Sequence, residues 1–421
     1  MHDLSCDVKK QTMAEIAPFK AVFYNPKIVH LEDVVTPPYD VIEPAQREEF
    51  YQKSPYNIIR IILGKERDKY VQANNYFTAW QRDKIFCQDK KEVIYLYRQR
   101  YCIRKKKKES FGFLALLKLE SLKNGSVIPH EKTFLQHRKD RYQLLAHCRA
   151  NFSPIFSLYQ DTEQRIGKEL KKETGKIPFL EFRDGEKVMH QVWRLTDKVT
   201  IKRITSLMKN KKIYIADGHH RYQSALLFHQ RNPERSSPFV LSYFTNILAP
   251  SLSILSTHRL INKRKKFAET MKQVEKFFEI RETEKKEFFK QLQSYSHRHS
   301  FGLYPGKGKF FILILRNEKI MKNFVNKEDV TKYLDVTIAH KLLIEHLFKS
   351  NEVSYFKDEE LLLMKVDEEK GKTIAIFLNP IRATQLMEIC GKRKVLPQKS
   401  TYFYPKIPAG LLIHQFGAVS K

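Results

Sequence analysis

The chain has 421 residues and a formal charge of +30, from 77 lysine and arginine against 47 aspartate and glutamate residues. This length suffices for two or three domains, and a content of 42% hydrophobic and 12% aromatic residues excludes a disordered chain. No apolar run approaches the roughly 18 residues that a membrane helix needs. Because the N-terminus has no signal-peptide core, we expect a cytoplasmic protein with no membrane contact. The five cysteines form no CxxC pair, which argues against a disulfide framework or a cysteine zinc site.

The positive charge has two explanations. Clustered lysine and arginine bind the phosphates of nucleic acids, whereas scattered lysines only make a solvated surface. The basic runs at 104–108, 209–212 and 263–266 are short and are not interleaved with stacking aromatic residues. Nucleic acid is therefore an alternative partner that the sequence does not favour.

In chain order, the first elements surround the segment VVTPPYDVI, whose two prolines make a rigid loop. Residues 70–86 have helical spacing of their aromatic side chains. Residues 92–103 and 110–120 alternate like strands, with the basic run RKKKKE between them. This pattern predicts a hairpin with a basic loop.

Strands and helices continue to interleave without strict alternation, which predicts an α+β (mixed α/β) fold. The Lys/Glu-rich composition of one internal stretch predicts a solvated helical insertion. We therefore expect four segments: residues 1–92, 93–262, 263–328 and 329–421.

The pattern with the strongest functional content is ADGHHRYQSAL, where a buried strand runs directly into a helix. Asp217 stands at the expected helix N-cap, and Gly218 permits the turn. The helix N-terminus and Arg221 together suit a phosphate group. His219 and His220 could donate to phosphate oxygens or shuttle a proton, and Asp217 could hold Mg²⁺. The alternative is an ordinary helix cap followed by surface histidines.

A second pattern, IPHEKTFLQHRKDRYQLL, places polar residues ahead of a predicted helix. Glu131 is a candidate general base for a hydroxyl group, and Thr133 is a candidate substrate contact. Arg141 is a candidate for the phosphate side of a nucleotide. The alternative for HRKDR is a charged helix start.

Three further loops carry candidate binding groups. The PPYD turn presents Tyr39 and Asp40 as candidate substrate contacts, although the same turn could only cap the next helix. In STHRLI, His258 and Arg259 follow a strand and suit phosphate or carboxylate. Lys399 lies in PQKSTYFYPK, a loop that either wraps a ligand or is simply well packed.

Together and in this order, the motifs resemble the bacterial and archaeal family catalogued as domain of unknown function 1015. The resemblance covers about residues 17–415 and rests on PPYDVI at 37–42, SPYN at 54–57, HEKT at 130–133, KDR at 139–141, DGHHRY at 217–222, LDV at 334–336 and PQKSTYFYPK at 397–406. The chain departs from the family before THR, where NILAPSLSILS replaces an acidic, glycine-containing turn and Ser256 replaces a proline. A member that retains only nucleotide binding is therefore a third alternative.

DGHHR with an upstream glutamate is also similar to the nucleotide-binding core of ParB/sulfiredoxin-like proteins. The free serine kinases of that group carry DGHxR and a glutamate as catalytic base. The resemblance implies a ParB/sulfiredoxin-like core with N-terminal and C-terminal α/β extensions, ATP or ADP with Mg²⁺, and Glu131 as base. It further implies that Asp217, His219 and Arg221 surround the phosphates and the metal.

The expected function is therefore a nucleotide-dependent phosphotransferase acting on a small hydroxylated metabolite, with free L-serine as the best candidate. The alternative is a non-catalytic ParB-like nucleotide-binding module that associates with nucleic acid or with a protein partner.

Overall fold

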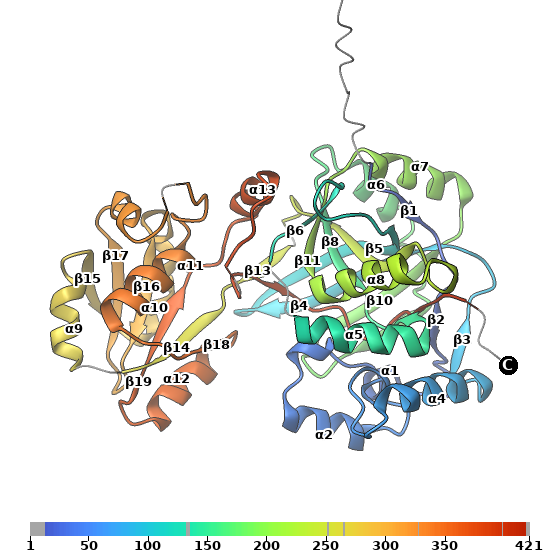
Figure 1. Cartoon of the computed structure of the whole chain (residues 1–421), viewed down its shortest axis with the longest axis horizontal. Coiled ribbons are helices and arrows are strands. Elements are labelled where there is room, and N and C mark those ends of the chain that lie inside the picture. The colour runs from blue at the N-terminus through green and yellow to red at the C-terminus, as the bar shows by residue number, and fades with distance from the viewer. Residues whose placement is uncertain are drawn as a thin grey trace, which may run out of the picture. The chain divides into compact units, whose positions relative to one another are not determined.

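The computed structural model describes residues 13–131, 135–250, 252–263, 266–326, 328–397 and 399–417, so the predicted substrate contact Thr133 lies outside the described residues. The chain divides into two compact units (Figure 1). The first unit comprises Met1–Pro129, Thr133–Leu252 and Pro405–Lys421, and the second comprises His130–Lys132 and Ser253–Tyr404. In the part of the chain that is described, no helix has both the length and the apolar character to cross a membrane.

The first unit is built on a nine-stranded sheet in the order β6-β11-β8-β12-β5-β4-β10-β9, with β1 paired to β5. Its strands are β1 (Ile16–Ala17), β4 (Ile94–Ile103), β5 (Lys106–Lys118), β6 (Val127–Pro129), β8 (Ile155–Tyr159), β9 (Leu180–Arg183), β10 (Met189–Leu195), β11 (Ile213–Asp217) and β12 (Phe239–Asn246). β6 runs parallel to β11 and β8 runs parallel to β12, while the other neighbours are antiparallel. The expected mixed α/β class is confirmed by this large mixed sheet.

Helices and short strands complete the first unit. They are β2 (Val22–Tyr24), α1 (Leu31–Val34), α2 (Pro44–Lys53), α3 (Ile59–Ile62), α4 (Lys69–Arg82), β3 (Phe86–Gln88), α5 (Leu135–Cys148), β7 (Ala150–Asn151), α6 (Arg165–Lys171), α7 (Lys198–Lys209), α8 (His219–Arg231) and β21 (His414–Gln415). α5 and α8 lie side by side (Figure 1), joined by the rings of Tyr142 and Phe228, whose centroids are 5.5 Å apart. Alternate strand residues such as Phe113 and Ile215 form the core with Phe228.

The predicted hairpin of β4 and β5 is confirmed, but its loop is much shorter than expected. Pairing continues to Ile103 opposite Lys106, so the turn consists of Arg104 and Lys105 alone. Their φ angles of 46° and 64° are both left-handed. Such a two-residue turn matches the twist of the strands, so most of the basic run extends β5 instead of forming a loop.

The second unit contains a six-stranded antiparallel sheet in the order β15-β17-β16-β19-β14-β18. Its elements are β13 (Ser253–Leu255), β14 (His258–Asn262), α9 (Phe267–Val274), β15 (Phe278–Thr283), α10 (Lys285–Ser294), β16 (Ser300–Tyr304), β17 (Phe310–Leu315), α11 (Asp335–Ile338), a π-helical continuation (Ala339–Phe348), β18 (Val353–Phe356), α12 (Glu359–Glu368), β19 (Thr373–Leu378), α13 (Ala383–Gly391) and β20 (Tyr402–Tyr404). Phe288 of α10 and Leu362 of α12 pack against this sheet.

Residues 263–328, expected as a helical insertion, supply three strands of this sheet as well as α9 and α10. The physical reason is the apolar run of β17, FFILIL, which is mostly buried between neighbouring strands despite the lysine-rich surroundings. The second unit thus combines strands from three of the four expected segments.

Candidate functional site

The junction between β11 and α8 is where the DGHHR motif lies in the first unit. β11 ends at Asp217, and Gly218 occupies the N-cap of α8 with a φ of 87° and no side-chain cap. Asp217 therefore does not cap the helix as expected. Its carboxylate instead accepts hydrogen bonds from two cationic side chains, and it makes no capping hydrogen bond with the first N–H groups of α8.

Asp217 lies at the centre of a buried ion-pair cluster. Lys406 Nζ donates to Asp217 Oδ1 at 2.8 Å, and Arg221 Nη2 donates to Asp217 Oδ2 at 2.7 Å. The side chain of Asp217 is only 15% exposed, and those of Arg221 and Lys406 are 11% and 12% exposed. Burial acts to raise the pKa of Asp217, but the charges of Lys406 and Arg221 outweigh it and hold this pKa well below its usual range. The cluster is therefore ionised at neutral pH.

Gly218 is required at this junction for two reasons. Its φ is in the left-handed region, which a residue with a side chain enters at a cost. In addition, a Cβ at this position would lie 2.9 Å from Cζ of Arg221. The glycine thus leaves space for the guanidinium group beside the backbone.

Arg221 is held by the first unit but keeps one unused donor. Its Nη1 donates to the backbone oxygen of Pro154. Its Nε is buried and has no hydrogen-bond partner among the described residues. A buried donor without an acceptor is costly, and a phosphoryl oxygen would satisfy it.

Arg141 of α5 is a second buried cation, with 8% of its side chain exposed. Its Nε donates to Asp140 at 2.8 Å, and its Nη2 donates to the backbone oxygen of Ile62 at 2.9 Å. Its guanidinium carbon lies 4.0 Å from the centroid of the Tyr39 ring. Burial raises the pKa of Tyr39 to about 12 although the charge of Arg141 opposes this shift, so the phenol is neutral. Asp40, in the same turn, is exposed.

Arg141 and Arg221 both line one cavity of about 50 Å³ in the first unit. Its wall also contains Ile62, Leu144, Leu145, Ala150, Asn151, Phe152, Ser153, Ser224 and Val240. Such a volume holds a few water molecules or one phosphoryl group, and it is too small for a whole nucleotide. The structure thus brings together two cations that were predicted from separate motifs.

The two histidines of the motif differ in burial. His219 is 7% exposed, and His220 is partly exposed. When His219 is protonated, its charge also lowers the pKa of Asp217, after the larger effects of Lys406 and Arg221. The chemical roles proposed for His219 and His220 stay predictions.

Four predicted site residues, Glu131, His258, Arg259 and Lys399, belong to the second unit. The backbone N–H of Lys399 donates to Glu131 Oε1 at 3.3 Å. His258 Nδ1 accepts from the backbone N–H of Leu378 at 3.2 Å. That these four residues share one site with Asp217 stays a prediction.

Arg259 is 1% exposed and is held largely by neutral groups of the second unit. It donates to the backbone oxygen of Thr257, to that of Lys399 at 3.2 Å and to His340 Nε2 at 3.2 Å. Burial lowers the pKa of Arg259 to about 10, so the group stays charged at neutral pH. Because Arg259 is charged, it remains suited to the predicted contact with a nucleotide. In this structure, its hydrogen bond to the backbone oxygen of Lys399 holds the loop that contains Lys399.

The donor set around Asp217 does not fit Mg²⁺. Magnesium is usually held by free carboxylate oxygens, whereas both oxygens of Asp217 already accept hydrogen bonds from cations. Within the described ranges, no group of three or more His, Cys, Asp or Glu side chains could hold a metal ion.

We expect Asp140 to contribute to acid stability. Burial acts to raise its pKa, but the charge of Arg141 and hydrogen bonds from Lys69, Arg141 and Tyr70 lower it to about 2. Because the folded pKa is depressed, this stabilisation is present above pH 4 and is lost as the pH falls through 2. Its size is about 2 kcal/mol. Urea unfolding at pH 7 and pH 2.5 should show a smaller acid-induced loss for Asp140→Asn than for the wild type; equal losses would contradict this role.

Sequence reasoning missed Lys406 as a partner of Asp217 and Asp140 as the anchor of Arg141. Lys406 was one basic residue of an aromatic loop, and 189 positions separate it from Asp217. Asp140 joins α5 to α4 through Lys69 Nζ and the Tyr70 hydroxyl, each at 2.8 Å. The sequence signal that could have identified Asp140 is its place in the KDR motif, next to Arg141.

Known structures resemble the chain only distantly. A conserved hypothetical protein from Pyrococcus furiosus is 16% identical with a TM-score of 0.30, covering 68% of this chain and 90% of that one. A free serine kinase in complex with AMP is 15% identical with a TM-score of 0.31, covering 66% and 83%. SbnI with a C-terminal truncation, from Staphylococcus aureus, is 10% identical with a TM-score of 0.35, covering 70% and 85%.

No curated protein matches the chain significantly in sequence. A protein family does match it, over residues 16–337, which is more than half of its length. The chain therefore belongs to the family described as "Protein of unknown function (DUF1015)".

Proposed function

We propose that the chain is a nucleotide-dependent phosphotransferase that acts on a small hydroxylated metabolite, with free L-serine as the leading candidate. The observation that carries this proposal is the cavity lined by both Arg141 and Arg221 in the first unit. Two guanidinium groups in a buried setting suit the charge that develops on a transferring phosphoryl group. The proposal includes a ParB-like nucleotide-binding core and a cytoplasmic location.

The buried Nε of Arg221 supports this assignment, because a phosphoryl oxygen would supply the acceptor that it lacks. Asp217 then serves as a positioning residue, since its carboxylate fixes the guanidinium of Arg221 and the ammonium of Lys406. Tyr39, neutral and stacked on Arg141, is a proposed substrate contact. A nucleotide would bring its own divalent ion on its phosphates.

Glu131 is the proposed general base that takes the proton of the substrate hydroxyl. Its place in the HEKT motif, ahead of DGHHRY in the sequence, supports this choice. A carboxylate in this role loses its activity when it is protonated or replaced by an amide.

The test is a phosphoryl-transfer assay on the full chain with ATP or ADP and Mg²⁺. L-Serine, L-threonine, L-homoserine and glycerol serve as acceptors, and phosphorylated products are read by mass spectrometry. We expect phosphoserine. Nucleotide binding without any phosphorylated product would favour the non-catalytic alternative, and the absence of nucleotide binding would end both.

One observation favours the alternative, a nucleotide-binding module that associates with nucleic acid. An open groove of about 1420 Å³ in the first unit has five lysines in its wall, together with Glu15 and Glu92. These lysines are Lys20, Lys91, Lys198, Lys202 and Lys209. Binding to duplex DNA that weakens steeply with salt would support this reading, because it reports the release of counterions from phosphates.

A further inference from the structure

The cavity of about 50 Å³ that Arg141 and Arg221 line, which we call the two-arginine cavity, also has Ser153 in its wall. Ser153 and Arg221 are partly exposed, whereas the other residues of this wall are buried. The side of the cavity that is open to solvent is therefore the side on which Ser153 and Arg221 lie. A phosphoryl group that enters the cavity from solvent passes the hydroxyl group of Ser153.

The backbone on both sides of Ser153 is fixed. The next residue is Pro154, and a residue that precedes proline is restricted to extended conformations. The backbone oxygen of Phe152 accepts from the N–H of Gly410 at 2.9 Å, and the backbone oxygen of Pro154 accepts from Nη1 of Arg221. This second hydrogen bond ties the guanidinium group of Arg221 to the residue next to Ser153, so the two groups keep a fixed relation.

Ser153 has hydrogen-bonding groups that the folded chain does not use. In the part of the chain that is described, neither its hydroxyl group nor its backbone N–H makes a hydrogen bond. The buried Nε of Arg221 also lacks an acceptor there. No aspartate or glutamate stands among the described residues of the wall. The oxygens of a phosphoryl group would supply acceptors for these donors.

Arg141 shares its one carboxylate with a second cation. Asp140 accepts from Nε of Arg141 and from Nζ of Lys69, each at 2.8 Å. Among the described residues, neither Arg141 nor Lys69 makes another ion pair, so this group of three keeps one positive charge. A phosphoserine carries about 1.5 to 2 negative charges at neutral pH, which this charge and that of Arg221 would attract.

We propose that the chain phosphorylates its own Ser153 and that the phosphoryl group then fills the two-arginine cavity. This rests on the function proposed above, which brings the terminal phosphoryl group of a nucleotide to this cavity. Ser153 carries the same primary hydroxyl group as the leading acceptor, free L-serine. Oγ of Ser153 forms a bond to the terminal phosphorus, and the bond from that phosphorus to the bridging oxygen breaks. The bridging oxygen keeps the electron pair and leaves with the shortened nucleotide, while the hydroxyl proton passes to water.

Phosphorylation of Ser153 would regulate the same site. The new dianion contacts Arg141 and Arg221 and supplies the acceptor that the Nε of Arg221 lacks. Because the cavity holds one phosphoryl group, the terminal phosphoryl group of a further nucleotide is excluded by volume and by like charge. The modification therefore switches off the phosphotransferase when nucleotide is plentiful and the acceptor is absent.

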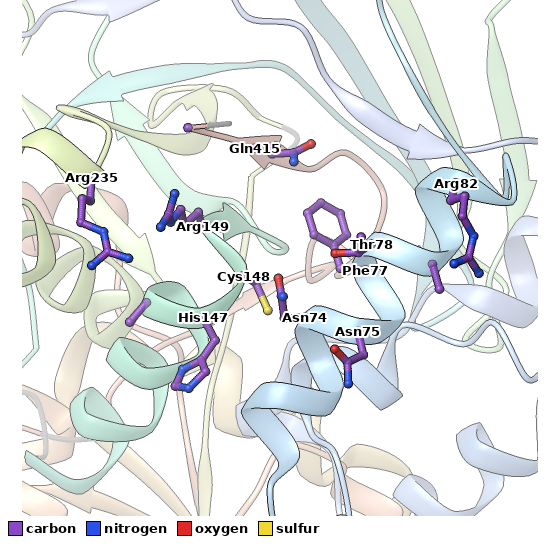
Figure 2. A pocket seen from close by; sticks show the side chains of 13 residues that line it. Asn74, Asn75, Phe77, Thr78, Arg82, His147, Cys148, Arg149, Arg235 and Gln415 are labelled. Carbon is purple, nitrogen blue, oxygen red and sulfur yellow. The ribbon is translucent and has the colours of Figure 1, made fainter. Parts of the chain in front are cut away.

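The experiment incubates the full chain with ATP or ADP and Mg²⁺ without any acceptor, and peptide mass spectrometry locates the phosphorylated residue. We expect phosphoserine at Ser153, formed at a rate per chain that does not depend on protein concentration, and none at this position in Ser153→Ala. Thr78→Ala is the matched control. Thr78 is a half-buried hydroxyl residue in the wall of a separate cavity of about 540 Å³, which arginines also line (Figure 2). Thr78 should stay unmodified, and Thr78→Ala should be phosphorylated on Ser153 like the wild type.

Turnover assays after preincubation with nucleotide alone test the regulation. Preincubation should lower the turnover of the wild type by at least about tenfold, whereas Ser153→Ala should keep its own starting rate. The inference is overturned if a metabolite is phosphorylated but Ser153 is not, and the function proposed above would then stand. Phosphorylation of Ser153 without any metabolite product would support the inference and remove only the small acceptor. Transfer to neither would end both.

A second measurement does not depend on the transfer activity. The chain is produced with phosphoserine incorporated at position 153 during translation, and the phosphate is titrated by ³¹P NMR. Two guanidinium groups should hold its second pKa below the usual value of about 6, and unfolding in urea or Arg221→Gln should bring it back towards that value. A phosphate that titrates at its usual pH in the folded chain would lie in solvent, and the inference would then be wrong.

Discussion

Asp217→Ala should lower the free energy of unfolding of the first unit by about 3–5 kcal/mol, because it leaves two buried cations without their anion. Lys406 and Arg221 are only 12% and 11% exposed, so water replaces little of the lost interaction. The stabilisation belongs to the ionised carboxylate, whose pKa is held below its usual range by Lys406 and Arg221 against the opposing effect of burial. It is therefore present above about pH 4 and is lost as the pH falls.

Differential scanning calorimetry of the full chain at pH 7 would measure this change, since it resolves separate unfolding transitions. Asp68→Ala is the matched control, because Asp68 is an exposed carboxylate of the same unit whose side chain, among the described residues, accepts a hydrogen bond only from Gln72 Nε2, at 3.1 Å. We expect the control to stay within about 0.5 kcal/mol of the wild type. A similarly small change for Asp217→Ala would show that the ion-pair cluster does not hold the first unit together.

Glu131→Gln should reduce phosphoryl transfer by about 10²–10⁴-fold, the usual contribution of a general base. The substitution keeps the shape of the side chain and an oxygen that can accept from the N–H of Lys399, so the local structure should survive. Because the amide cannot take a proton, the loss should fall on the rate of the chemical step, and the affinity for nucleotide should stay unchanged.

Single-turnover kinetics with the acceptor found in the product screen would separate these effects. Glu49→Gln, in an exposed position of α2, provides a control for the loss of one carboxylate. A variant Glu131→Gln with normal turnover would remove Glu131 from the mechanism. A variant that loses nucleotide affinity together with turnover would instead indicate a structural role for the contact with Lys399.

The cluster around Asp217 also links the C-terminal segment of the chain to the candidate site. Lys406 follows β20 and belongs to the segment that returns to the first unit, where Gln99 Nε2 donates to its backbone oxygen at 3.0 Å. Its ammonium group then reaches the end of β11. The candidate site therefore requires the C-terminal segment, although the DGHHR motif lies near the middle of the sequence.

Much of the local structure follows from the sequence alone. The aromatic spacing predicted for residues 70–86 corresponds to α4 as far as Arg82, while Phe86 begins the strand β3. The alternation on either side of Arg104 and Lys105 corresponds to β4 and β5. The run KIYIADGHHR corresponds to β11 and α8. These predictions succeed because helix and strand periodicity and turn chemistry act between residues that are close in the sequence. The family, too, was evident from the order of its motifs.

The candidate site depended on long-range packing. The pairing of Asp217 with Lys406, the stacking of Tyr39 on Arg141, and the shared cavity of Arg141 and Arg221 join segments that no local pattern connects. The strands within 263–328 were hidden for a related reason, because their burial is decided by neighbouring strands and their lysine-rich flanks obscure it. By itself, the sequence determined the elements, the family and the residues capable of phosphate chemistry. Only the tertiary structure decided which of those charges are buried and paired, because burial and pairing arise when distant segments pack together.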